Sequence, residues 1–211
     1  MARSGSLFIV SGPSGSGKSA LAASVLATVS NLRFSVSYTT RPPRGNEQNG
    51  VEYYFVSPEE FEELRRSGQL LEWANIYGNL YGTSRKGIEE ILQRGEDVLL
   101  DIDVQGARSL REKCPQALSV FILPPSFQVL RERLEKRKLD KKYVIEQRLR
   151  IACDEIQQYR HYDYLIINDE FEKSADELKA IVTGSRCRLD VRAERAESIL
   201  KTFGGVDAQH P

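Results

Sequence analysis

The stretch Gly12–Ser19 constrains this chain more than any other, because it matches G-x-x-x-x-G-K-[ST] directly after the apolar run Leu7–Val10. Glycines let successive backbone N–H groups point toward one anion, and the N-terminus of a following helix adds its positive dipole end. Lys18 is expected to reach the β- and γ-phosphates of a nucleotide, and the Ser19 hydroxyl to hold Mg²⁺. The pattern predicts a strand, a phosphate-binding loop (P-loop) and a helix, in that order.

Short apolar runs alternate with helical patterns along the chain. In the helical stretches, apolar residues recur three or four positions apart, whereas the runs themselves are bounded by Gly, Pro or polar residues. This alternation predicts an α/β fold: a three-layer α/β/α domain of the P-loop type with a central parallel sheet. The runs expected to form strands of that sheet are Leu7–Val10, Asp97–Ile102, Ala117–Leu123 and Tyr164–Ile167.

Composition narrows the class of protein. A chain of 211 residues suits one domain with insertions. Its 30 basic and 30 acidic side chains balance, so no overall charge attracts nucleic acid or a membrane. Three scattered cysteines and two histidines fit neither a disulfide framework nor a zinc site. Without a spanning segment or a signal peptide pattern, we expect a cytoplasmic protein that binds neither nucleic acid nor membranes.

Two insertions interrupt the alternation. From Phe34 to Tyr81 the chain is rich in Tyr, Thr, Arg and Gly, with one short helix predicted from Ser57 by its N-cap, N1 proline and capping-box glutamate. Gly68 is expected to end that helix. From Ser126 to Tyr159 the chain is strongly charged, and two apolar stripes predict a helical hairpin. Insertions on a rigid sheet are common places for functional residues.

The first insertion carries Arg41 and Arg44 on a segment stiffened by two prolines. Guanidinium groups bind phosphate oxygens bidentately, so these two residues suggest a second phosphate site. A solvated basic loop is the alternative that the two residues alone leave open.

Carboxylates follow the second predicted strand. Strand periodicity places Asp101 and Asp103 on one side, at the carboxyl end of a parallel strand, where open α/β sheets bind ligands. Asp101 could hold metal-bound water beside the P-loop. Taken singly, Glu72 and Asp103 fit ordinary surface carboxylates better than ligand contacts.

Several motifs together resemble those of guanylate kinases, over about residues 5 to 184. Besides the P-loop, they occur in the order known in that family: Ser37-Tyr-Thr-Thr-Arg41-Pro-Pro-Arg44, Asn49-Gly-Val-Glu-Tyr53-Tyr-Phe-Val, Glu72-Trp-Ala, Tyr81-Gly-Thr83, Asp101-Ile-Asp103-Val-Gln-Gly and Ile166-Ile-Asn168-Asp. The resemblance implies transfer of the γ-phosphoryl group of ATP to GMP, and to dGMP, with Mg²⁺. It further implies one domain with a core (1–33, 89–124, 159–184), a GMP-binding subdomain (34–88) and a lid (125–158), followed by a tail (185–211).

Specific roles follow from the resemblance. It assigns the ATP phosphates to the loop residues Gly12, Pro13, Ser14, Gly15, Ser16, Gly17, Lys18 and Ser19. It assigns the GMP phosphate to Arg41, Arg44, Tyr53 and Tyr81, and guanine to Ser37, Glu72, Thr83 and Asp103. Guanine presents N–H donors at N1 and N2, which a carboxylate complements, whereas adenine presents a lone pair at N1.

The resemblance also implies how the reaction is catalysed. The catalytic residues would be Lys18, Arg133, Arg137 and Arg148, with Mg²⁺ held by Ser19 and, through water, by Asp101. No general base is expected, because the attacking phosphate oxygen is already largely ionised, with a second pKa of about 6. The chain departs from the family pattern after Arg137, where Lys138-Leu-Asp-Lys-Lys142 replaces a glycine turn and an acidic pair.

Two other functions remain open on the sequence: a P-loop kinase for another small phosphorylated acceptor, and a non-catalytic binding module with the same fold. The tail adds another open question. Its apolar residues Leu189, Ala193, Ala196, Leu200 and Phe203 are spaced as on one face of a helix. That face either packs on the core or pairs with a second subunit in a homodimer or higher oligomer, and residues 204–211 are expected to be disordered.

Overall fold

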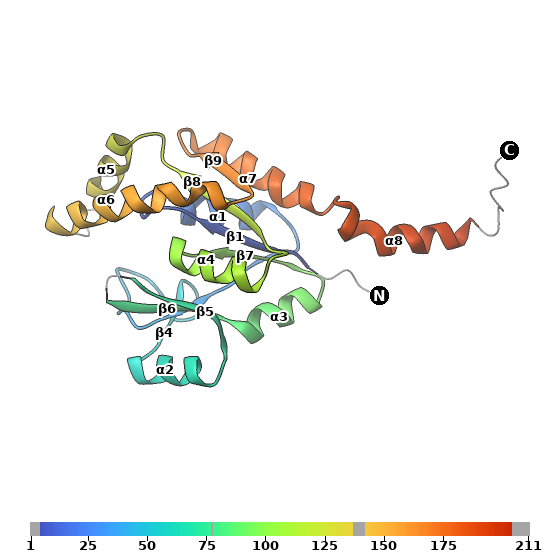
Figure 1. Cartoon of the computed structure of the whole chain (residues 1–211), viewed down its shortest axis with the longest axis horizontal. Coiled ribbons are helices and arrows are strands. Elements are labelled where there is room, and N and C mark those ends of the chain that lie inside the picture. The colour runs from blue at the N-terminus through green and yellow to red at the C-terminus, as the bar shows by residue number, and fades with distance from the viewer. Residues whose placement is uncertain (1–4, 77, 137–141, 204–211) are drawn as a thin grey trace.

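A five-stranded parallel sheet lies at the centre of the molecule (Figure 1). The computed structural model describes residues 5–76, 78–136 and 142–203. The strands are arranged in the order β2-β7-β1-β8-β9. Their bounds are β1 Leu7–Ser11, β2 Leu32–Phe34, β7 Asp97–Asp101, β8 Leu118–Leu123 and β9 Tyr164–Ile167.

Helices bury both faces of this sheet. Phe8 and Val10 of β1 pack on one side and Leu7 and Ile9 on the other, because successive strand residues point to opposite faces. The first side is covered by α1 (Lys18–Thr28) and α7 (Phe171–Ser185), and the second by α3 (Arg85–Gln93) and α4 (Val104–Lys113). The predicted three-layer α/β/α fold is therefore confirmed.

The four predicted strands all form, within one residue at each end. The sequence pattern missed β2, since three residues with one arginine among them show no periodicity. It pairs with β7 and forms one edge of the sheet.

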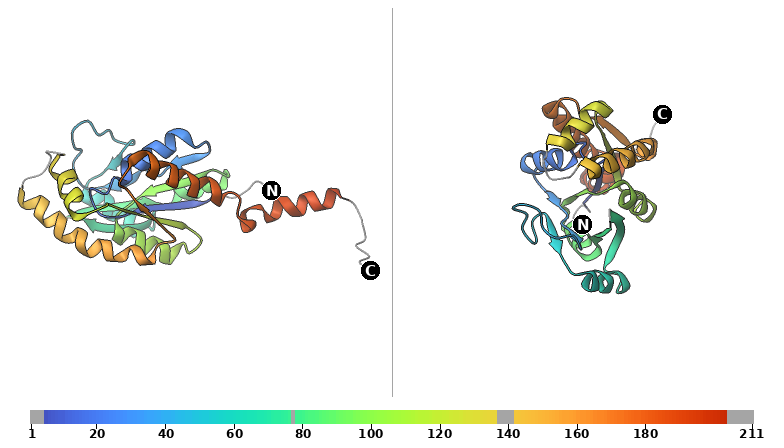
Figure 2. Two further views of the ribbon diagram at one scale, coloured as in Figure 1. Left: turned by 90° about the horizontal axis from the view of Figure 1, so that it is seen from above. Right: turned by 90° about the vertical axis from the view of Figure 1, so that its left-hand side faces the viewer.

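The first insertion forms a second, mixed sheet beside the first (Figure 2). Its order is β4-β3-β6-β5, with β3 parallel to β4 and β6 antiparallel to both β3 and β5. The bounds are β3 Ser37–Thr39, β4 Tyr53–Phe55, β5 Leu70–Ile76 and β6 Asn79–Ser84. This small mixed β/α insertion agrees with the expected architecture.

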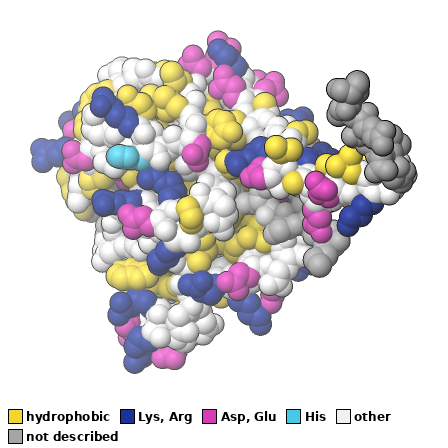
Figure 3. Space-filling view, turned by 45° about the vertical axis from the view of Figure 1, so that its right-hand side comes forward, with side chains coloured by type: hydrophobic (Ala, Val, Ile, Leu, Met, Phe, Trp, Pro, Cys, Tyr) yellow, Lys and Arg dark blue, Asp and Glu magenta, His cyan; other side chains and the backbone are white. Residues whose placement is uncertain are grey.

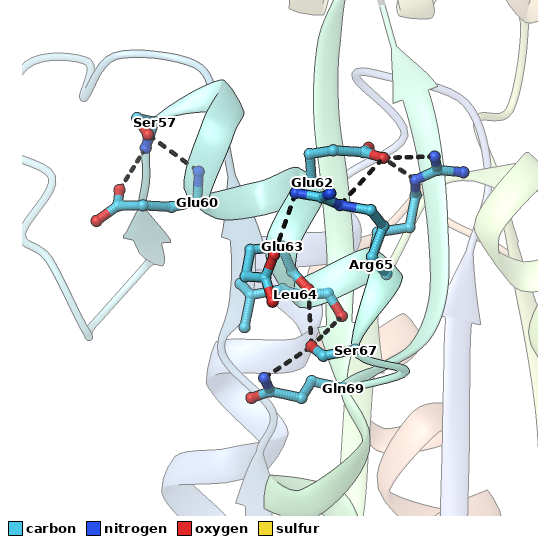
Figure 4. Close-up of polar contacts among 9 residues, drawn as sticks. Ser57, Glu60, Glu62, Glu63, Leu64, Arg65, Ser67 and Gln69 are labelled. Atoms are coloured by element: carbon cyan, nitrogen blue, oxygen red, sulfur yellow. Dashed lines mark hydrogen bonds and ion pairs between the residues drawn. The ribbon is translucent and has the colours of Figure 1, made fainter.

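Helix α2 (Pro58–Arg66) packs against the second sheet. Figure 4 shows the capping box: Ser57 Oγ accepts from the Glu60 N–H at 3.1 Å, and the Glu60 carboxylate accepts from the Ser57 N–H at 2.7 Å. Gly68 follows the helix with φ of 68°, a left-handed conformation that favours glycine. Both ends of the helix are where the sequence predicted them.

The charged insertion is a helical hairpin formed by α5 (Phe127–Lys136) and α6 (Lys142–Ile156). A short 3₁₀ helix, Gln157–His161, connects it to β9. The hairpin has a small core of its own, as its two apolar stripes predicted. That core consists of Leu130, Leu134, Ile145, Leu149 and Ala152.

The last helix, α8 (Leu189–Thr202), projects from the domain at the end opposite the hairpin (Figures 1 and 2). It buries none of its residues, so the expected alternative of packing on the core is wrong. Residues 204–211, expected to be disordered, lie outside the described residues.

The surface agrees with the balanced composition. Basic and acidic side chains are interspersed over the face seen in Figure 3, without a broad area of one sign. Within the described part of the chain, no helix is long and apolar enough to cross a bilayer.

Candidate functional site

One cleft of about 490 Å³ brings together most of the residues singled out in the sequence. It lies between the P-loop, the carboxyl end of β7, the second sheet and α6. From the predicted set it is lined by Gly12, Ser14, Gly15, Gly17, Lys18, Ser19, Ser37, Arg44, Tyr53, Glu72, Tyr81, Asp101, Asp103 and Arg148. The cleft is not lined by Pro13, Ser16, Arg41, Thr83 or Arg133.

The P-loop is held from behind by two residues of other elements. Asn168, just after β9, donates from Nδ2 to the Ser16 carbonyl at 2.7 Å. Arg133 of α5 donates to the same carbonyl at 3.2 Å and to the Asn168 carbonyl at 2.8 Å. Gly17 has φ of 99°, and a Cβ there would lie 2.2 Å from Asn168 Nδ2, so only glycine fits. This support fixes the loop before any phosphate binds.

Lys18 is folded back on its own loop. Its Nζ donates to the carbonyls of Gly12 at 2.9 Å and Pro13 at 3.2 Å. These are weak partners for an ammonium group compared with a charged phosphate, so the side chain is available to an anion that enters the loop.

Ser19, at the end of the P-loop, and Asp101, at the end of β7, are in direct contact. The Ser19 hydroxyl donates to the Asp101 carboxylate at 2.5 Å. A hydroxyl and a carboxylate are the hard oxygen ligands that Mg²⁺ prefers, so the donor set fits this ion. Within the described ranges no group of three or more His, Cys, Asp or Glu residues could hold a metal ion.

Glu72 of β5 is a buried carboxylate at the opposite end of the cleft. Its side chain is 3% exposed, and it accepts a hydrogen bond from the Thr83 hydroxyl. Burial, with a further contribution from the charge of Asp103, raises the pKa of Glu72 to about 7. Thr83 is fully buried and orients this carboxylate from behind.

Asp103 forms the N-cap of α4. Its two carboxylate oxygens accept from the backbone N–H groups of Gln105 at 3.0 Å and Gly106 at 3.1 Å. Burial raises the pKa of Asp103 despite these bonds. A Cβ on Gly106 would lie 2.7 Å from Glu72 Oε2, so the glycine lets the two acids share one end of the cleft.

Two arginines and one tyrosine of the insertion, Arg41, Arg44 and Tyr53, line an adjoining cavity of about 400 Å³. Arg44 and Tyr53 line both spaces, whereas Arg41 lines only the second. Burial raises the pKa of Tyr53 to about 12, so its hydroxyl remains protonated and can donate. The rings of Tyr53 and Tyr81 pack edge to face with centroids 5.8 Å apart.

The hairpin contributes a buried arginine to the cleft. Arg148 of α6 is 8% exposed and faces the space above the P-loop. Arg133 reaches the P-loop backbone instead, as described above. Arg137, the third arginine expected here, lies outside the described residues.

The structure adds three residues that the sequence analysis gave no role: Glu47, Glu155 and Asn168. Glu155 lies seven positions after Arg148, on the same face of α6, and lines the cleft. Burial raises the pKa of Glu155 to about 7, opposed by the charge of Lys18. Asn168 directly follows the carboxyl end of a predicted strand. Asp101 was singled out because open α/β sheets bind ligands at the carboxyl ends of their strands, and the same reasoning could have singled out Asn168.

Comparison with known proteins identifies relatives along most of the chain. The family model described as Guanylate kinase matches residues 4–185. The guanylate kinase of Geobacter metallireducens is 47% identical over 188 residues, which cover 89% of this chain and 93% of that protein. The guanylate kinase of Nitrosomonas europaea is 46% identical and covers 93% of this chain and 98% of its own.

Solved structures agree with the sequence relatives. The crystal structure of guanylate kinase from Anaplasma phagocytophilum superposes with a TM-score of 0.75 at 35% identity, covering 89% of each chain. The structure of TT1252 from Thermus thermophilus superposes with a TM-score of 0.50 at 13% identity, which supports the fold alone.

Proposed function

The chain belongs to the guanylate kinase family and transfers the γ-phosphoryl group of ATP to GMP, giving ADP and GDP, and we propose that the P-loop side of its cleft binds ATP while the second-sheet side binds GMP. One observation carries this division: a single cleft joins a phosphate-binding loop to a buried carboxylate, Glu72, at its far end. The two ends require two chemically different substrates.

The base of GMP would bind at the acidic end. Ionised Glu72 accepts from the N1–H and N2–H groups of guanine, with Asp103 and Ser37 beside it and Thr83 holding the carboxylate. A buried carboxylate facing the N1 lone pair of adenine would be costly, which favours guanine. We assign no contact to the ribose hydroxyls, so dGMP should also be an acceptor.

The phosphate of GMP would bind to Arg41, Arg44, Tyr53 and Tyr81. Arginine forks match phosphate oxygens, and the two tyrosine hydroxyl groups add neutral donors. Arg44 and Tyr53 line both cavities, whereas Tyr81 lines the cleft and Arg41 the adjoining cavity, which supports an acceptor phosphate at this side of the P-loop.

The phosphates of ATP would bind to the P-loop, Gly12–Ser19, through its backbone N–H groups and Lys18. Ser19, with Asp101 through water, would hold Mg²⁺, which when bound neutralises phosphate charge. Lys18 would exchange its bonds to the loop carbonyls for bonds to phosphate.

Catalysis would depend on position and charge. The attacking group is an ionised phosphate oxygen, so the protein must hold two anions in line. Arg137 and Arg148 of the lid (125–158) would neutralise the phosphoryl group in transit, whereas Arg133 would support the P-loop through its bonds to the Ser16 and Asn168 carbonyls. The core (1–33, 89–124, 159–184) and the GMP-binding subdomain (34–88) would hold the substrates.

A screen of acceptors tests the function directly. With ATP as donor, we expect ADP to form with GMP and dGMP, and more than about a hundredfold less with AMP, UMP or dTMP, since Glu72 discriminates at the base. A coupled assay of ADP release measures this. ADP formation with another acceptor would favour a different small-molecule kinase, and no ADP with any acceptor would favour a binding module.

Glu72→Gln should raise the KM for GMP by about a hundredfold and leave the KM for ATP unchanged. Of the two substrates, only GMP would form hydrogen bonds with this carboxylate. In the wild type, the KM for GMP should rise about tenfold from about pH 8 to about pH 6, as Glu72 becomes protonated through its pKa of about 7. In the Glu72→Gln enzyme, the KM for GMP should change with pH only because the GMP phosphate itself titrates.

Steady-state kinetics with GMP varied at each pH measures this, and Glu63→Gln on the exposed face of α2 is the matched control. A Glu72→Gln enzyme with the wild-type pH dependence would contradict the assignment.

Arg148→Ala should lower kcat by about a hundredfold while changing either KM by less than about threefold, because its charge acts mainly on the phosphoryl group in transit. Arg150 is exposed on the same helix, and Arg150→Ala should leave both parameters near their wild-type values. Initial-rate kinetics with both substrates varied compares them. Equal losses in kcat and in substrate affinity would argue against a transition-state role for Arg148.

Helix α8 would join two or more copies of this chain. Its Leu189, Leu200 and Phe203 are 82%, 62% and 69% exposed, and an isolated helix of about 14 residues gains little stability without packing. Leu200→Glu should therefore lower the molecular mass measured by light scattering to that of one chain. Ser198→Glu, on an exposed position of α8, is the control. A wild type of 23.9 kDa in solution would refute the pairing.

A further inference from the structure

Arg41 is held by a carboxylate that the proposed reaction does not otherwise use. Glu47 accepts from Arg41 Nη1 at 2.7 Å and from Nη2 at 2.8 Å, a bidentate ion pair. The guanidinium group is 6% exposed and lies over the rings of Tyr53 and Phe55, 5.0 and 5.7 Å from their centroids. Its plane and its direction are both fixed.

The contacts leave one edge of the guanidinium group for a ligand. Nη1 uses its second hydrogen on the Pro42 carbonyl at 2.8 Å. Among the bonds within the described residues, three of the five Arg41 N–H groups are thus used on the side of Glu47 and Pro42. The other two, on Nε and Nη2, point in parallel along the other edge, which is the geometry that two phosphate oxygens require. The Tyr81 hydroxyl, itself assigned to the GMP phosphate, is a further hydrogen-bonding neighbour of this guanidinium group.

The same carboxylate also determines the position of Arg44. Glu47 Oε2 accepts from the Arg44 N–H at 2.8 Å, and the Glu47 N–H donates to the Arg44 carbonyl at 3.1 Å. The segment between the two arginines is therefore closed into a turn around one side chain.

We propose that Glu47 is a positioning residue for the acceptor phosphate: it orients the Nε–Nη2 edge of Arg41 and the backbone of Arg44 before GMP binds. The inference rests on the proposed assignment of the GMP phosphate to these arginines. Glu47 neutralises the charge of Arg41, so its benefit is geometric, and Arg44 supplies the net positive charge. A fixed guanidinium loses less conformational freedom when the phosphate arrives.

Glu47→Gln tests the proposal, because an amide offers Arg41 one oxygen and places a donor against the other N–H. We expect the KM for GMP to rise at least about tenfold and the KM for ATP to stay within about twofold. The inhibition constant of guanosine, which lacks the phosphate, should also stay within about twofold. Glu47→Asp should recover part of the loss. The control is Glu52→Gln, since Glu52 is exposed in the same loop and also accepts from a backbone N–H, that of Gln48 at 2.8 Å.

A double-mutant cycle separates positioning from general support of the fold. If Glu47 acts through Arg41, Glu47→Gln should add little to the loss in Arg41→Ala. A KM for GMP that is unchanged or lower in Glu47→Gln would overturn the proposal, as would an equal weakening of GMP and guanosine. Failure of the proposed function would look different, because the wild type itself would then not phosphorylate GMP.

Discussion

The parallel register of β1 with its two neighbours is the constraint on which the rest of the structure depends. Val10 pairs with Asp101 of β7, and Ser11 pairs with Phe121 of β8. The P-loop therefore begins beside Asp101, the carboxylate to which the Ser19 hydroxyl donates. The carboxyl ends of parallel strands share one edge of a sheet, so Asn168, which follows β9, also reaches the loop. Burial of both faces of the sheet makes this edge rigid.

The cleft has two electrostatic halves. At one end, Glu72 and Asp103 are buried close together, and burial raises the pKa of both. For Glu72 the folded protein holds a proton that the unfolded chain would release, so between its ordinary pKa of 4.5 and about 7 stability falls as the pH rises. The ionised carboxylate is thus costly to the fold, and it is the form that guanine would stabilise.

The other half is cationic and receives its side chains from two insertions. The first insertion contributes Arg44 to the cleft and Arg41 to the adjoining cavity, and the hairpin contributes Arg148 to the cleft. Arg41 and Arg148 are buried before substrate arrives, and Glu47 holds the backbone of the exposed Arg44, so little reorganisation of the two buried side chains is required when phosphates bind. Both insertions have cores or caps of their own, which lets each keep its internal geometry.

Local patterns in the sequence determined the P-loop, the central strands, the capped helix α2 and the apolar stripes of the hairpin, because each depends on residues a few positions apart. Motif order also indicated which residues line the cleft. Tertiary structure alone decided that Thr83 donates to Glu72, that Arg133 supports the loop with Asn168, and that α8 buries none of its residues. It also paired Glu47 with Arg41, although both belong to one short loop. Such contacts depend on which groups are buried together, and burial follows from packing between segments distant in the chain.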